Sequence, residues 1–153
     1  MKRRAFIAGS AALLAVPGRV PAQGTKPTKR LAMLRPNGTV PISTANSRSY
    51  WNQFFDELSR RGYVEGQNLI VVRFSAEGDQ DRSGTVIQQA IDTAPDVIYC
   101  QTATMLATIR PSIPVSIPVV LLSSDPIAWG FTTSFARQSG NITGVTIDSG
   151  LEL

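Results

Sequence analysis

The residues best suited to hold a small molecule lie in short polar stretches, each directly after an apolar, strand-like run of the chain. Threonine and serine hydroxyls in such positions suit a ligand carboxylate, and the carboxylate of Asp125 suits an ammonium group or a hydroxyl. Together they suit an amino acid or a similar small polar ligand. The candidate ligand-binding residues are Asn37, Gly38, Thr102, Ala103, Thr104, Ser124 and Asp125.

The same residues also have an ordinary structural interpretation, which the sequence leaves open. Thr102 and Ser124 are of the types that cap helix N-termini, and Asp125 followed by Pro126 is a common turn pair.

Several kinds of chemistry are excluded by residue types that are missing or rare. The chain has no histidine, which excludes His-based acid–base catalysis, Ser-His-Asp triads and most transition-metal sites. It has no glycine-rich nucleotide loop and no pair of carboxylates spaced for acid–base work. The single cysteine, Cys100, lies in an apolar run and is expected in the core. We therefore expect no enzyme, no metal and no cofactor.

Apolar runs alternate with amphipathic stretches and predict the elements that position the candidate residues. The predicted strands are 30–35, 68–74, 96–100, 117–123 and 142–147, and the predicted helices are 47–62, 79–93, 102–110 and, weakly, 127–137. This alternation predicts an α/β domain: a doubly wound parallel sheet of about five strands with helices on both faces. Ligands of such sheets gather at the carboxyl ends of the strands, where the candidate residues fall.

Two local features of the predicted helices can be checked against a structure. In 47–62, Trp51, Phe54, Phe55 and Leu58 share one face, as expected of a helix that docks on a sheet. In 79–93, Asp79 or Asp81 is expected to cap the N-terminus.

The first 22 residues predict an export signal. Arg3 and Arg4 precede an apolar run, 5–16, which is too short to span a bilayer, and small residues end at Ala22, where we expect cleavage. A retained first helix is the alternative, but the apolar residues cover every face of it. The two arginines, with Phe6 two places after Arg4, also resemble a twin-arginine signal, while a general secretory signal stays open. The protein is expected to be periplasmic or otherwise exported.

The net charge of +4 belongs to this leader. Four of the 15 Lys and Arg residues lie in residues 1–22, which leaves 11 bases against 11 acids in the rest of the chain. No basic stripe remains to bind a phosphate backbone, so we expect no nucleic-acid partner.

Three segments resemble the bacterial ABC transporter substrate-binding protein family: "RRGYVEGQNLIVVRFSAEGDQDR", "IPVVLLSSDPIAWGF" and "FARQSGNITGVT". The resemblance implies a type I periplasmic-binding-protein fold, in which two α/β lobes close on a small ligand, often an amino acid. Closure then presents a surface to a membrane permease. On this lobe the implied binding loops are Asn37-Gly38, Thr102 to Thr104 and Ser124-Asp125. Gln138-Ser139 replaces the family's proline before Gly140, and Gln101-Thr102 is expected to alter the pocket.

Domain organisation follows from the leader and the resemblance. We expect a signal peptide at 1–22, a flexible lead-in at 23–29, an N-terminal ligand-binding lobe at 30–150, and the start of a crossing to a missing second lobe at 151–153. Such a truncated chain would be a fragment with impaired function, unless two half-size lobes dimerise.

The leading functional hypothesis is therefore the solute-binding component of an ABC-type importer. The alternative is the sensing lobe of an exported ligand-binding regulatory protein, and a small α/β enzyme is a third.

Overall fold

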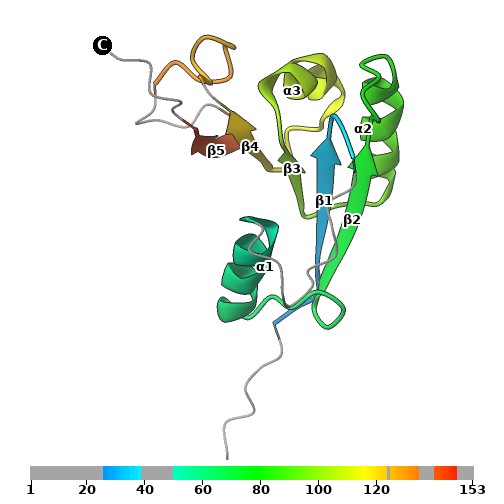
Figure 1. Ribbon diagram of the computed structural model, residues 1–153, viewed down its shortest axis with the longest axis vertical. Coiled ribbons are helices and arrows are strands. Elements are labelled where there is room, and N and C mark those ends of the chain that lie inside the picture. The colour runs from blue at the N-terminus through cyan, green and yellow to red at the C-terminus, as the bar shows by residue number, and fades with distance from the viewer. Residues whose placement is uncertain (1–25, 39–49, 124, 135–139, 148–153) are drawn as a thin grey trace, which may run out of the picture.

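Five parallel strands form a single sheet in the computed structural model, which describes residues 26–38, 50–123, 125–134 and 140–147 (Figure 1). Their order across the sheet is β2-β1-β3-β4-β5. The sequence order reverses at β1, whose two neighbours are β2 and β3, as in doubly wound folds. The strands are β1 (Lys29–Arg35), β2 (Leu69–Ser75), β3 (Val97–Cys100), β4 (Val119–Ser123) and β5 (Ile142–Thr146). The predicted α/β fold is confirmed.

The helices divide between the two faces of the sheet. Figure 1 shows α1 (Tyr50–Arg60) on one side, and α2 (Arg82–Asp92) and α3 (Ala103–Ile109) on the other. A short 3₁₀ turn, Arg110–Ser112, follows α3. In the described ranges, no helix is long and apolar enough for a membrane crossing.

Aromatic side chains attach α1 to its face of the sheet. Trp51 and Phe55 are buried, and the Trp51 ring meets the Tyr99 ring of β3 edge-on, with 5.7 Å between their centroids. Phe54 and Leu58 pack on the same cluster, which confirms the predicted helix face. Burial of such large rings supplies most of the free energy that holds an 11-residue helix in place.

The opposite face carries the larger core. Leu34 and Ile98 of the sheet pack there with Ile87 of α2 and Leu106 of α3, and all four side chains are fully buried. Cys100 belongs to the same cluster and has no exposed surface, as the sequence predicted. Burial raises the pKa of its thiol from the ordinary value of 9.0 to about 12.

One local prediction is wrong in the described residues, and another holds only for the position of the cap. The described part of the predicted helix 127–137 is a single turn that ends at Gly130, whose φ of +67° stops a right-handed helix. Neither predicted aspartate caps α2 with its side chain. Asp81 occupies the N-cap position without a side-chain bond, and Asp79 Oδ1 accepts a bond from the Asp81 N–H at 2.9 Å.

Candidate functional site

A hollow of about 270 Å³ lies at the carboxyl ends of β1, β2 and β3. The loop after β1, the loop after β2 and the start of α3 all contribute to its walls, so the segments that follow three neighbouring strands meet at one place. We call it the polar hollow. Its lining residues are Pro36, Asn37, Ala76, Gly78, Asp79, Gln80, Ser83, Thr102, Thr104, Met105 and Thr108.

The loop after β2 is fastened to the end of β1. The Ala76 N–H donates to the Arg35 carbonyl at 3.0 Å, and the Gly78 N–H donates to the Pro36 carbonyl at 2.8 Å. Gly78 has a φ of +86°, and a Cβ at this position would lie 3.0 Å from Asn37 Oδ1. A glycine is therefore needed at 78, and it lets the Asn37 amide lie against the loop.

The start of α3 forms the wall opposite this loop. Thr102 is in an extended conformation, and its side-chain oxygen accepts a bond from the Met105 N–H at 3.3 Å. It is therefore the N-cap of α3, as its ordinary interpretation predicted, although a capping hydroxyl keeps a proton to donate. Thr104, two residues further on, is exposed and lines the hollow.

Asp79 is the only charged residue that lines the polar hollow in the described structure. The nearby cation, Arg82, pairs with Glu77 instead, and Asp79 forms no ion pair with any described residue. The hollow therefore carries one negative charge among neutral donors and acceptors.

The structure brings three of the predicted site residues together, since Asn37, Thr102 and Thr104 all line the polar hollow. Gly38 is the exposed neighbour of Asn37, with a φ of +63°. Ala103 is 7% exposed and packs in the core, so its side chain faces away from solvent.

Asp125 lies apart from this group. Its carboxylate Oδ1 accepts bonds from the Ile127 N–H at 2.9 Å and the Ala128 N–H at 3.1 Å, and it does not line the hollow. The turn interpretation of this residue matches that geometry. The remaining predicted residues, Ser124, Arg3, Arg4 and Ala22, lie outside the described residues.

Sequence reasoning missed the contribution of the loop after β2. Asp79, Gln80 and Ser83 line the hollow because β2 lies directly beside β1. Asp79 follows a predicted strand just as the chosen residues do, which is the signal that could have found it.

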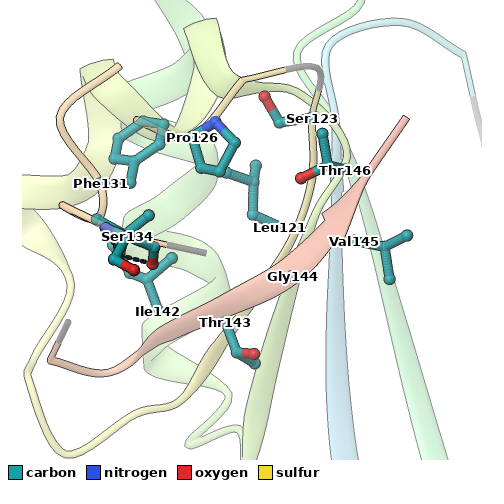
Figure 2. A pocket seen from close by; sticks show the side chains of 11 residues that line it. Leu121, Ser123, Pro126, Phe131, Ser134, Ile142, Thr143, Gly144, Val145 and Thr146 are labelled. Atoms are coloured by element: carbon teal, nitrogen blue, oxygen red, sulfur yellow. Dashed lines mark hydrogen bonds between the residues drawn. The ribbon is translucent and has the colours of Figure 1, made fainter. Parts of the chain in front are cut away.

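A second, smaller hollow of about 100 Å³ lies over β4 and β5. Figure 2 shows Leu121, Phe131 and Ile142 pointing toward one another across it, while Val145 points away on the other side of the sheet. Ser123 Oγ is buried at its rim without a hydrogen-bond partner in the described chain. Its volume is less than half that of the polar hollow, which leaves less room for a ligand.

A polar chain ties α1 to the carboxyl edge on the other face of the sheet. Arg35 Nε donates to Gln101 Oε1 at 2.7 Å, and Gln101 Nε2 donates to the Tyr50 hydroxyl at 3.1 Å. Burial raises the pKa of Tyr50, and the charge of Arg35 opposes this rise. Gln101 thus joins two elements and is not among the residues that line the polar hollow.

The strand order of this parallel sheet reverses at β1, and the polar hollow lies at the adjoining strand ends, which is where α/β domains of this class hold their ligands. The chain belongs to the family of ABC transporter substrate binding proteins, which it matches over residues 39–152. The family resemblance read from the sequence is confirmed.

One relative and one solved structure illustrate what the chain is similar to. A tyrosine-binding protein of Clostridioides difficile (strain R20291) is 26% identical over 105 residues, which make up 65% of this chain and 30% of the relative. The ligand-free, open structure of a substrate binding protein with adhesive properties from Clostridium difficile has a TM-score of 0.66 and 15% identity, over 81% of this chain and 40% of that one.

Two further solved structures share the fold. A conserved domain protein of Vibrio cholerae has a TM-score of 0.66 and 20% identity, over 80% of this chain and 40% of that one. An ABC domain in complex with L-Trp from Streptococcus pneumonia has a TM-score of 0.58 and 19% identity, over 78% and 38%. The chain therefore spans between 30% and 40% of the length of these relatives.

Proposed function

We propose that this chain is the solute-binding component of an ABC-type importer and that its polar hollow binds an amino acid. The observation that carries the proposal is the convergence of Asn37, Thr102 and Thr104, from two different strand ends, on one hollow. In a family defined by substrate binding, a polar hollow at the carboxyl edge is the natural place for a ligand.

The side chains of the hollow support a small polar ligand. Threonine hydroxyls and the Asn37 amide offer donors for a carboxylate, and Asp79 offers an acceptor for an ammonium group. The relatives point to the same class, since one is a tyrosine-binding protein and another was solved with L-Trp. The partner implied by the family is a membrane permease, which would receive the ligand after capture.

Filling the hollow tests this function. Thr104→Arg places a long side chain at an exposed position that lines the hollow, and we expect it to raise the Kd of the bound amino acid about tenfold or more. Thermal-shift measurements with the 20 L-amino acids and a set of organic acids identify the ligand first, and isothermal titration calorimetry then gives the Kd.

Ala107→Arg is the matched control, because Ala107 is exposed on the same helix and does not line the hollow. It should leave the Kd unchanged. Equal binding by both variants would place the ligand elsewhere, and no thermal shift with any compound would overturn the proposed function.

We also propose that the protein is exported and cleaved after Ala22, because the leader pattern accompanies a family whose members work outside the inner membrane. N-terminal sequencing of the exported protein should begin at Gln23. If the twin-arginine route is used, replacing Arg3 and Arg4 with lysine should leave the uncut chain inside the cell. An exported chain that still begins at Met1 would contradict cleavage.

A further inference from the structure

We infer that Asp79 selects ligands that carry an ammonium group, and that the polar hollow rejects ligands whose only charge is negative. This inference rests on the proposed function, since it names the chemistry of the ligand at the same site. It assigns the electrostatic selection to a residue in the loop after β2, a position that the sequence pointed to only as a helix cap.

The charge balance of the hollow is the first argument. Among the residues that the structure describes, its walls combine neutral side chains with one carboxylate, that of Asp79, and include no Lys or Arg. Arg82, the nearest cation in sequence, pairs with Glu77. A cationic group entering the hollow therefore gains an attraction that no described residue already satisfies, whereas a lone anion meets a like charge.

The second argument is a comparison of the hydrogen bonds that Asp79 and Asp125 already accept. Asp79 and Asp125 both follow strands, but the Asp125 carboxylate accepts two backbone bonds within its own turn and lies outside the hollow. Asp79 accepts one backbone bond, from Asp81 through Oδ1, and lines the hollow. A carboxylate has room for about four hydrogen bonds, so Asp79 keeps acceptor capacity for a ligand.

The position of Asp79 is set by backbone bonds before any ligand arrives. Its own N–H donates to the Ala76 carbonyl at 3.0 Å, and Gly78 next to it is bonded to Pro36. A carboxylate held in this way loses little freedom when it binds an ammonium group. Thr102 and Thr104, which line the same hollow, offer hydroxyls to the carboxylate of the same amino acid.

Three related compounds separate the two charges of one ligand: L-tyrosine carries both, tyramine carries only the ammonium group, and 3-(4-hydroxyphenyl)propanoate carries only the carboxylate. Their Kd values are measured by isothermal titration calorimetry on the full 153-residue chain, on Asp79→Asn and on Asp81→Asn. Asparagine at 79 keeps the oxygen that accepts the Asp81 N–H, so the loop should keep its conformation. Asp81 is an exposed acid two residues away that does not line the hollow, and its variant controls for net charge.

We expect Asp79→Asn to raise the Kd of L-tyrosine and of tyramine about tenfold or more, and not to raise the Kd of the propanoate. Asp81→Asn should leave all three Kd values unchanged. Unchanged L-tyrosine binding by Asp79→Asn would overturn the inference and leave the proposed function standing. An equal loss for the propanoate, or binding of none of the three, would also overturn it. The proposed function itself is tested separately, by the thermal-shift panel and by the Thr104→Arg and Ala107→Arg variants.

Discussion

Replacing Trp51 with alanine is expected to lower the free energy of unfolding by about 4 kcal/mol. Trp51 is 3% exposed and contacts rings on both its own helix and the sheet, including Tyr99 of β3. In the described structure α1 is the only helix on this face, so the cavity left by the indole would lie at the sole helix–sheet contact there. Urea unfolding followed by far-UV circular dichroism measures the loss.

Trp129 supplies the control, since it is the second of the two tryptophans in the chain. It is 43% exposed and stacks on Phe131, 6.4 Å between centroids, in the turn after β4. Trp129→Ala should cost less than about 1 kcal/mol, because little buried area is lost. Equal losses for the two variants would mean that α1 contributes no more to stability than a surface turn.

Replacing Gly144 with alanine is expected to lower the free energy of unfolding by about 3 kcal/mol. Gly144 pairs with Leu121 across β4 and β5, and a Cβ there would lie 2.1 Å from the Leu121 carbonyl oxygen. No side-chain rotation can relieve a contact with backbone, so the two strands must separate locally. The same unfolding experiment measures the effect.

Gly84→Ala is the matched control for this substitution. Gly84 lies inside α2, and a Cβ there meets no heavy atom within 4 Å. Alanine should therefore raise stability by about 1 kcal/mol through its higher helix propensity. A loss at Gly84, or no loss at Gly144, would contradict the steric explanation.

Long-range architecture was the most predictable part of this protein. Continuous apolar runs such as 68–74 and 117–123 identified the strands, since such runs are typical of parallel sheets in α/β proteins. The helix predicted at 127–137 is wrong in its described part, because Asp125 accepts backbone bonds and Gly130 has a positive φ, so that only a single turn forms. Such a choice depends on individual backbone bonds, which hydrophobic periodicity does not record.

The site was predictable only where it depends on strand ends. Asn37 and Thr104 follow strands that become neighbours, so the general rule for α/β sheets brings them together. The rule cannot tell Asp79 from Asp125, since both follow strands. Which carboxylate stays available depends on the nearest backbone N–H groups and on β2 lying at the side of β1.

The burial of the Cys100 thiol determines how the folded protein would respond to oxidants. Peroxides and disulfide-exchange enzymes react with accessible thiolates, and Cys100 has neither an exposed surface nor, with a pKa of about 12, an appreciable thiolate fraction near neutral pH. Once folded, the protein should resist covalent dimerisation and sulfenic acid formation without reductants. Oxidation of this thiol is therefore confined to the unfolded chain, so for the proposed exported protein the order of folding and export would decide whether Cys100 is oxidised.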